Sequence, residues 1–399
     1  MIEQILACCA RQDPIAATIP VLEECFDGFS QWDLLLDRAQ FHGMAPLLWH
    51  HLKMSTISVP IQQKHLLKLL AYRCRHANQV RLSLLKEVLK LLQQAGIEVV
   101  VLKGMVLASQ IYSEIGMRPM RDIDLLLKEE SFEDAENVLS GLGFRAEIPH
   151  HVLQEHHHMV PLFKEIDGVH VELELHRRLL PVLPRYPKLD YDAVAQNLIT
   201  IDLEGVEAFS LDYGGMLCYL FEHGFRMPLY YEPFRLMHLA DIVTLVEKKF
   251  DVIDWQEMGR VSPEVLSGLA QLHQLCPFSE PVMEHLGIKE SRAAVTIGKD
   301  YQGWPRHRWS TTEKSRYPQL LLDTLFPPLW WQHLYYNDGK KYSTLAYWFL
   351  HLSYIAELMA EWRLRHYPER NEKPPVTIRW LQWLSDSLRF AAKGFPSLR

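Results

Sequence analysis

The sequence has few cysteines, no long uncharged apolar run and no repeated unit. Its six cysteines are spread over 399 residues without a Cys-x-x-Cys motif. In a chain of this size, that spread predicts reduced, buried thiols and argues against a disulfide framework. No apolar run reaches the roughly eighteen uncharged residues of a membrane span. The start, Met1 to Gln4, lacks the basic and apolar segments of a signal peptide, so a cytoplasmic location is expected.

An excess of positive charge is also lacking. Lys and Arg number 42 against 49 Asp and Glu, which gives a formal net charge of −7. This balance gives no general attraction to nucleic acid or to anionic membranes, although a local basic patch stays open. The hydrophobic fraction of 48% is that of an ordinary globular protein, and the length allows two or three domains.

Helical periodicity dominates both ends of the chain. Residues 1–95 show it in the segment Trp32 to Phe41, and again from about His65 to Ala95, before Gly96. After Tyr213 the pattern is again mostly helical. The stretch 300–340, rich in Trp, Pro and Tyr, is expected to be irregular and well packed. The expected C-terminal helices cover 213–224, 233–250, 262–275, 343–367 and 376–392.

The pattern changes to strands between residues 96 and 210. The β-branched run Ile97 to Leu102 predicts a strand, and Asp167-Gly168 is a strong hairpin signal. We therefore expect an α+β fold with a central sheet domain, 96–210, between an N-terminal helical region, 1–95, and a C-terminal helical domain, 211–399. Further strands are expected at 121–127, 158–164, 169–176 and 198–203, with helices at 105–115 and 129–142.

Two carboxylates stand two residues apart in the expected strand 121–127. Asp122 and Asp124 would therefore lie on one face of that strand. Holding them together is costly unless a positive charge sits between them, and oxygen ligands suit Mg²⁺. The alternative is a solvated strand end with both carboxylates in water.

The strand 169–176 alternates strictly between apolar and polar residues. Glu172, Glu174 and His176 share its polar face with His170. A third carboxylate beside the aspartates would complete a two-metal site of the kind that binds a triphosphate. An amphipathic edge strand facing water would show the same alternation.

A third element is Lys103-Gly104, directly after the first expected strand. Glycine lets the backbone approach a ligand closely, and the start of the next helix offers N–H groups to a phosphate. By itself this pattern is weak, because a glycine often follows a strand in folds that alternate strands and helices.

Together these residues resemble the nucleotidyltransferase fold of the polymerase β type. More closely, the chain is similar to an uncharacterised bacterial nucleotidyltransferase family. The hallmarks of that family are Leu-Lys-Gly, an Arg-rich run with Asp-Ile-Asp-Leu-Leu, and an acidic-x-His motif. They stand here as Leu102–Gly104, Arg118–Leu126 and Glu174–His176. The similarity extends over most of the chain and includes the segment His42–Leu48.

The resemblance implies a metal site and a nucleotidyltransferase-type mixed β-sheet. Asp122 and Asp124 match the metal ligands, for Mg²⁺ or Mn²⁺, and they are the expected catalytic residues together with Glu174. Glu172 is a rival for the third position because it shares the same face. Gly104 matches the glycine that contacts phosphate in the fold.

The sequence departs from the family pattern beside that glycine. Met105 stands where a serine often helps to hold the phosphate, and the gap from Gly104 to Asp122 is longer than usual. We hypothesise that Lys103 or Arg121 supplies the missing phosphate contact. For Lys103 the alternative is a structural ion pair.

The implied activity is transfer of a nucleoside monophosphate from an NTP to an acceptor, with release of pyrophosphate. No side chain stands out as a general base. A non-catalytic nucleotide-binding or scaffold protein is the first alternative, because the serine is missing. An enzyme acting on nucleic acid is the second, and the acidic balance weighs against it. Neither the NTP nor the acceptor, whether small molecule, protein hydroxyl or RNA end, follows from the sequence.

Several histidines are candidates for further site residues. The group His150, His151 and His156–His158 suggests zinc, but no cysteine lies nearby, so solvated loop and strand residues are favoured. His176 is expected either to orient Glu174 or to pack at the end of its strand.

Residues beyond the central domain give weaker signals. They either line a cleft or form helix-surface ion pairs, which contribute little. The aromatic pairs Trp330-Trp331 and Tyr335-Tyr336 are expected to fill the core. The cleft candidates are His223, Arg226, Arg235 and Asp241.

Overall fold

The computed structural model describes residues 1–147, 156–181, 189–226, 235–288, 317–336, 342–366 and residue 385. Its centre is a mixed sheet of seven described strands in the order β3-β4-β5-β2-β1-β7-β6. The predicted α+β class with a mixed sheet is confirmed. The strands are β1 (Val100–Val101), β2 (Asp122–Leu126), β3 (Arg145–Ala146), β4 (Leu162–Ile166), β5 (Val169–His176), β6 (Leu198–Asp202) and β7 (Glu207–Leu211).

The middle of the sheet combines parallel and antiparallel pairs. β2 pairs with β5 in parallel and with β1 in antiparallel orientation, while β1 pairs with β7 in parallel. β4 and β5 form the hairpin that Asp167-Gly168 predicts, with positive φ at both turn residues. β5 therefore lies inside the sheet, and the alternative of an edge strand is wrong.

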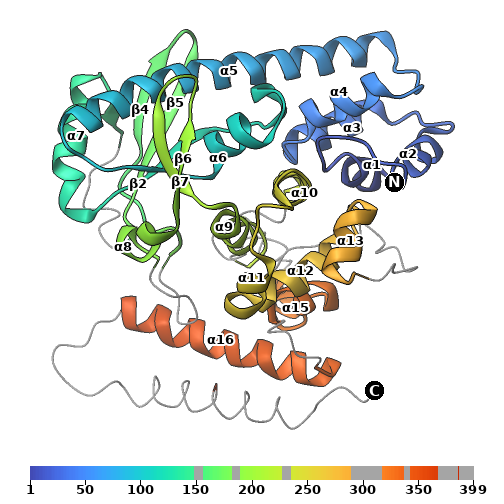
Figure 1. Ribbon diagram of the computed structural model, residues 1–399. Helices are drawn as coiled ribbons and strands as arrows, with labels where there is room; N and C mark the ends of the chain where they lie inside the picture. The colour runs from blue at the N-terminus through green and yellow to red at the C-terminus, as the bar shows by residue number, and fades with distance from the viewer. Residues whose placement is uncertain are drawn as a thin grey trace.

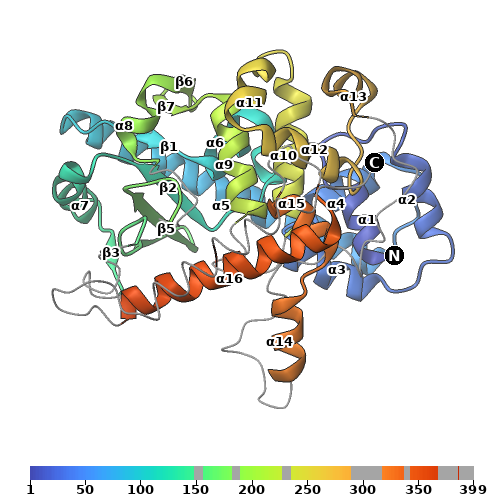
Figure 2. The same ribbon diagram turned by 90° about the horizontal axis from the view of Figure 1, so that it is seen from below.

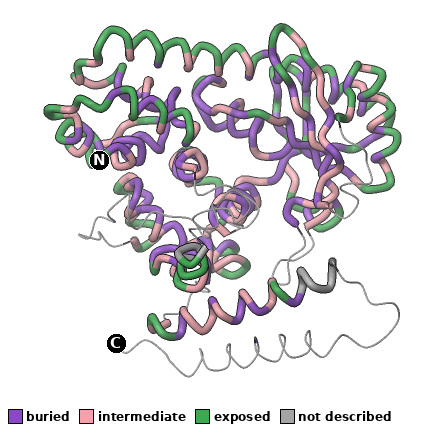
Figure 3. Tube along the Cα trace, turned by 180° about the vertical axis from the view of Figure 1, so that it is seen from behind, coloured by how far each residue is buried: buried purple, intermediate pink, exposed green. Residues whose placement is uncertain are grey.

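The N-terminal helices are α1 (Ile2–Cys8), α2 (Ile19–Phe26), α3 (Trp32–Phe41), α4 (Ala45–Met54) and α5 (Ile61–Gln94). α5 extends from α3 and α4 to α7 (Phe132–Gly141) and β5, so it joins the N-terminal helices to the sheet (Figure 1). Its residues from Val80 to Leu92 include most of its buried side chains, whereas its outer side is exposed (Figure 3).

Short helices connect the central strands. α6 (Lys103–Val106) follows β1 and continues as the π-helical turn η1 (Leu107–Ile111), and η2 (Ile115–Met117) packs on α5. The short helix η3 (Glu129–Ser131) precedes α7. After β5 the chain forms α8 (Tyr191–Val194) and the turn η5 (Ala195–Asn197).

The C-terminal part is helical, as predicted. α9 (Tyr213–Phe225) and α10 (Leu236–Lys249) pack on each other beside the sheet, where α9 contacts β7 and α10 contacts η1 (Figure 2). The other described helices are α11 (Trp255–Val261), α12 (Pro263–His273), α13 (Glu280–Leu286), α14 (Tyr317–Leu325), α15 (Leu329–Tyr336) and α16 (Thr344–His366).

The stretch 300–340 differs from its prediction. The described part is mostly α14 and α15, so the expectation of irregular structure is wrong there. Prolines 327 and 328 interrupt the helices only between Leu325 and Leu329, since a proline is tolerated at a helix start. The side chains of Trp331 and Tyr335 are buried, which confirms that these aromatics fill the core. The expected helix at 376–392 lies outside the described residues apart from residue 385.

The six cysteines all lie in the described residues and are all free thiols. Burial raises the pKa of the Cys8 and Cys74 thiols to about 12, so these two thiols are protonated at neutral pH. No helix among the described residues is long and apolar enough to cross a membrane.

Candidate active site

The predicted carboxylates meet on one face of the sheet, because β2 and β5 are parallel and in register. Asp122 lies opposite Glu172, and Asp124 lies opposite Glu174. Facing residues on paired strands have Cβ atoms about 5 Å apart, so the four carboxylates form two adjacent pairs. The strand alternation alone brings them there, since each pair of residues is spaced by two along its own strand.

His176 joins the Asp124–Glu174 pair. Its Nε2 lies 3.1 Å from Asp124 Oδ1 and 3.2 Å from Glu174 Oε2. The ring is 1% exposed, and Asp124 is 2% exposed. One oxygen of each carboxylate and this ring nitrogen lie within 4.8 Å of one another. The expectation that His176 orients Glu174 agrees with this geometry, and His176 also contacts Asp124.

Charge pairing decides the protonation states at this point. Burial would raise the pKa of the Asp124 carboxyl, but Lys103 and the His176 hydrogen bond hold it below its usual range. Burial would also lower the pKa of His176, yet its contacts with Asp124 and Glu174 raise that pKa to about 9. At neutral pH the group is therefore an imidazolium that donates to two carboxylates.

Lys103 stands beside Asp124 from the opposite side. Its Nζ lies 3.6 Å from Asp124 Oδ2 and 2.9 Å from His223 Nε2, and it lies 5.7 Å from the centre of the Tyr219 ring. Burial and the nearby ammonium of Lys103 keep the pKa of His223 well below its ordinary value. His223 is therefore neutral and can accept a hydrogen bond from Lys103. The ion pair considered as the alternative for Lys103 is present, and its partner is the site's own carboxylate.

Asp122 and Glu172 form the outer pair and are both half-buried. Burial and the neighbouring Asp124 raise the pKa of Asp122. Burial and the carboxylate of Glu174 raise the pKa of Glu172 to about 7. Four acidic groups on one face thus repel one another, which is the condition that a bound cation would relieve.

The site opens into a cavity of about 530 Å³. Both Lys103 and Arg121, the two expected phosphate contacts, line it together with Asp122 and Glu174. Arg121 is exposed, whereas Lys103 is half-buried. The remaining lining residues include His156–His158, His176, His223, Arg235 and His238.

Gly104 packs beside a buried guanidinium, that of Arg118. A Cβ at this position would lie 3.4 Å from Arg118 Nη1 and 3.8 Å from the Asp122 carbonyl oxygen. Gly104 is itself buried and lies one residue after Lys103. These distances are ordinary van der Waals contacts, so α6 packs closely on the start of β2 and a Cβ would still fit at this position.

Arg118 forms a bidentate ion pair with Asp241 of α10. Its Nε donates to Oδ1 at 2.9 Å and its Nη2 donates to Oδ2 at 2.8 Å, while the Tyr112 hydroxyl donates to Oδ1 at 3.1 Å. Arg118 is 5% and Asp241 0% exposed, so a helix-surface ion pair is the wrong description of Asp241. Sequence reasoning missed this network because 123 positions separate the partners. Only the Arg-rich run before Asp122 hinted at it.

The histidine group is less solvated than predicted. His157 is buried at 6% exposure, and His156 and His158 are half-buried in the cavity wall. Burial lowers the pKa of His156 to about 4, so it is neutral at pH 7. The three histidine rings pack against one another, and those of His157 and His158 also pack against His176. The backbone bridge between His158 and His176 brings this segment against β5. His150 and His151 lie outside the described residues.

The other C-terminal candidates divide into two kinds. Arg235 lines the cavity, as a cleft residue would, and His223 does so from α9. Arg226 instead pairs with Glu222 at 2.6 Å and lies 3.7 Å from Glu264, so it forms the ion pairs expected on helices.

The donor atoms suit a divalent cation. Asp124 Oδ2 is buried and accepts no hydrogen bond among the described residues, although the Lys103 ammonium lies nearby. A buried carboxylate oxygen without a hydrogen bond is costly. Hard oxygen ligands on two rigid neighbouring strands are what Mg²⁺ or Mn²⁺ requires. Asp122, Asp124 and Glu174 can supply these ligands. Glu172 lies opposite Asp122, whereas His176 contacts the other pair, Asp124 and Glu174.

Three solved structures of nucleotidyltransferases and a related protein are similar to part of this chain. A solution structure of the antibiotic-resistance factor ANT(2'')-Ia is 14% identical over 47% of this chain and 95% of that chain, with a TM-score of 0.31. A crystal structure of ANT(2'')-Ia in complex with adenylyl-2''-tobramycin is 13% identical over 42% and 88%, with a TM-score of 0.30.

The third structure is an antigenic nucleotidyltransferase-like protein from Paracoccidioides brasiliensis. It is 16% identical over 54% of this chain and 95% of that chain, with a TM-score of 0.35. The search of curated proteins found no match. A family model described as an uncharacterised nucleotidyltransferase matches residues 30–264, which is more than half of the chain and includes the whole carboxylate site. The chain belongs to this uncharacterised nucleotidyltransferase family.

Proposed function

We propose that this protein is a metal-dependent nucleotidyltransferase that moves a nucleoside monophosphate from an NTP to an acceptor. One observation carries the proposal. The in-register strands β2 and β5 bring Asp122, Asp124 and Glu174 together, and Asp122 and Glu174 line a 530 Å³ cavity together with Lys103 and Arg121. A carboxylate cluster beside cationic side chains suits Mg²⁺ and a triphosphate. The family match supports the same class of reaction.

In this proposal the three carboxylates are the metal ligands and catalytic residues. Bound Mg²⁺ or Mn²⁺ would neutralise phosphate charge and polarise the phosphoryl group that reacts. His176 positions two of the ligands, since its Nε2 holds one oxygen each of Asp124 and Glu174. The other oxygen of Asp124, Oδ2, accepts no hydrogen bond from a described residue and lies 3.6 Å from the Lys103 ammonium.

Lys103 and Arg121 are the proposed phosphate contacts. Both line the cavity, and their charges can take the place of the serine that Met105 replaces. Gly104, the other expected phosphate contact, is buried and is not among the described residues that line the cavity. The site would thus hold the triphosphate with side-chain cations more than with backbone N–H groups.

The proposed reaction is a single displacement at phosphorus. An acceptor hydroxyl oxygen forms a bond to the α-phosphorus, and the bond from that phosphorus to the oxygen bridging to the β-phosphorus breaks. Pyrophosphate leaves with the electron pair, and the hydroxyl proton passes to water. The residues act by position and charge, which supply most of the catalysis in reactions of this kind.

Transfer of label from α-³²P-NTPs tests the proposal. The purified protein is incubated with each of the four NTPs, Mg²⁺ or Mn²⁺, and fractions of a cell lysate as acceptors. We expect one fraction to be labelled, and Asp124→Asn and Glu174→Gln to lower labelling by at least about a hundredfold. The matched control is Glu133→Gln, an exposed carboxylate at the start of α7, which should label as the wild type does.

Labelling that survives Asp124→Asn would contradict the proposal. Calorimetric binding of an NTP with no transfer to any fraction would instead favour the non-catalytic nucleotide-binding alternative. In that case the departure at Met105 would be the first explanation to examine.

A further inference from the structure

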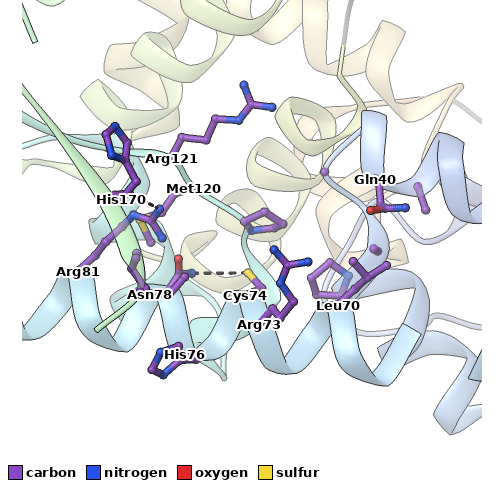
Figure 4. A pocket seen from close by; sticks show the side chains of 18 residues that line it. Gln40, Leu70, Arg73, Cys74, His76, Asn78, Arg81, Met120, Arg121 and His170 are labelled. Atoms are coloured by element: carbon purple, nitrogen blue, oxygen red, sulfur yellow. Dashed lines mark hydrogen bonds between the residues drawn. The ribbon is translucent and has the colours of Figure 1, made fainter. Parts of the chain in front are cut away.

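A second cavity of about 570 Å³ adjoins the candidate active site. It lies between α5, the segment before β2 and the turn between β4 and β5. Figure 4 shows Arg73, Asn78 and Arg81 on α5, with Met120 and Arg121 across from them. The two cavities share the wall residues Gln40, Gly43, Pro119, Met120 and Arg121.

The charged side chains that line this second cavity are positive. Arg73, Arg81 and Arg121 line it, and no Asp or Glu is among its described lining residues. Arg73 and Arg121 are exposed at the cavity and form no ion pair with a described residue. The chain as a whole has a net charge of −7. This cavity is therefore a site of local positive electrostatic potential on a protein with an excess of negative charge.

Arg81 is the most informative of the three. It is 7% exposed, and its Nε and Nη1 have no hydrogen-bond partner among the described residues. Its Nη2 makes only a long hydrogen bond, 3.4 Å, to the His170 carbonyl oxygen. A buried guanidinium without an ion pair is costly, and such groups are normally matched by an anion.

Two further observations agree with a missing anion. Burial lowers the pKa of Arg81, and the carboxylate of Asp122 opposes that shift without reaching ion-pair distance. Asn78 donates both amide hydrogens, to the carbonyl oxygens of Ile115 and Arg118, at 2.7 and 2.8 Å. Its Oδ1 is buried and accepts no hydrogen bond from a described residue. The cavity therefore offers donors for an anion and one acceptor for a hydroxyl.

We propose that this second cavity binds the acceptor substrate, and that the acceptor is a small hydroxyl-bearing molecule with a phosphate group. The phosphate lies against Arg81, with Arg73 on its outer side, because a guanidinium can donate two parallel hydrogen bonds to phosphate oxygens. The acceptor hydroxyl then lies beside Met120 and Arg121, which line both cavities, and faces Asp122 in the first one. This inference rests on the proposed nucleotidyl transfer, and it adds the chemical class of the acceptor.

Calorimetric titration with inorganic phosphate tests the site directly. The full-length protein is first saturated with a non-hydrolysable ATP analogue and Mg²⁺, so that the first cavity is filled. We expect one phosphate to bind, and Arg81→Gln to weaken binding by about tenfold or more, since a charge-assisted contact is lost. Arg81→Lys should weaken it less. The matched control, Arg75→Gln, is exposed on the same helix and pairs with Glu114 outside this cavity, so it should bind as the wild type does.

Arg73→Gln gives a second test that does not touch a buried residue. It should weaken phosphate binding by about threefold, because its guanidinium is exposed. Unchanged phosphate binding in Arg81→Gln, or in Arg73→Gln if Arg81→Gln does not fold, would overturn the inference. Loss of phosphate binding when the ATP analogue is present would also overturn it, since both ligands would then occupy one site.

A titration of the protein with the ATP analogue, made before phosphate is added, separates this inference from the proposed function. Failure of the analogue to bind in that titration would contradict nucleotidyl transfer. Failure of phosphate to bind a protein that does bind the analogue would contradict only the acceptor site.

Discussion

Lys103 balances the negative charge of Asp124 in the candidate site through its ammonium group. Its ammonium lies 3.6 Å from Asp124 Oδ2 and 2.9 Å from His223 Nε2, and it lines the cavity. It therefore lowers the pKa of Asp124 and is also placed to meet a phosphate oxygen. The two interpretations of Lys103, ion pair and phosphate contact, are compatible because one side chain reaches both positions.

Replacing Lys103 should weaken nucleotide binding. Lys103→Met is expected to raise the Kd for an NTP by about tenfold, because one charge-assisted contact is lost. Equilibrium binding of a fluorescent ATP analogue measures the change. Lys90→Met, an exposed lysine on α5 away from the cavity, is the matched control and should leave the Kd unchanged. If Lys103→Met and Arg121→Met both bind as the wild type does, neither residue holds the phosphates.

The sequence predicts individual site residues where spacing alone decides their position. Asp122, Asp124 and Glu174 come together because each strand alternates with a period of two and the two strands pair in register. The partner of Arg118 could not be found in this way. Asp241 lies 123 positions later on a helix, and no local pattern links two such residues.

At the scale of elements, length and periodicity decide which predictions hold. β5 agrees with its predicted limits because eight alternating residues give a strong signal. β1 is only Val100–Val101, shorter than the predicted run Ile97 to Leu102, and β7 at Glu207–Leu211 is not predicted at all. β7 alternates over five residues only and leaves Phe209 43% exposed, so its sequence does not resemble a core strand.

The contact between η2 and α5 positions the segment that leads into β2. A Cβ on Gly116 would lie 2.7 Å from Arg75 Cβ and 3.0 Å from Arg75 Cα on α5. Gly116→Ala should therefore force the two elements apart and lower the free energy of unfolding by about 1–3 kcal/mol. Thermal unfolding measures this loss as a fall in Tm.

Gly141→Ala is the control for that substitution. Gly141 ends α7, and a Cβ at this position would have no neighbouring atom within 4 Å, so alanine should be neutral or slightly stabilising there. A Tm for Gly116→Ala equal to that of Gly141→Ala would show that η2 does not need to lie so close to α5.

At the scale of the whole molecule, the Arg118–Asp241 pair joins the sheet to the C-terminal helices. Arg118 precedes β2, and Asp241 lies in the middle of α10. One buried ion pair thus links the segment before β2 to α10, and residues of both line the first cavity. We expect the position of α10, and with it Arg235 and His238, to depend on this pair.

Asp241→Ala should destabilise the protein by roughly 3–5 kcal/mol, because it leaves the Arg118 charge buried without its partner. Urea unfolding measures the loss. The control is Glu257→Ala, which removes the partner of Arg260 from an exposed pair and should leave the unfolding midpoint unchanged. Equal midpoints for the two variants would mean that the buried pair is not what holds α10 to the sheet.

The most direct test of the account is Mn²⁺ binding in the presence of a non-hydrolysable ATP analogue, followed by the electron paramagnetic resonance signal of the unbound ion. The wild-type protein should bind Mn²⁺, and Asp124→Asn and Glu174→Gln should each weaken binding by at least about tenfold, since each removes a ligand charge. Glu133→Gln should bind as the wild type does. Mn²⁺ affinity that is the same in all four proteins would contradict the claim that these carboxylates form a metal site.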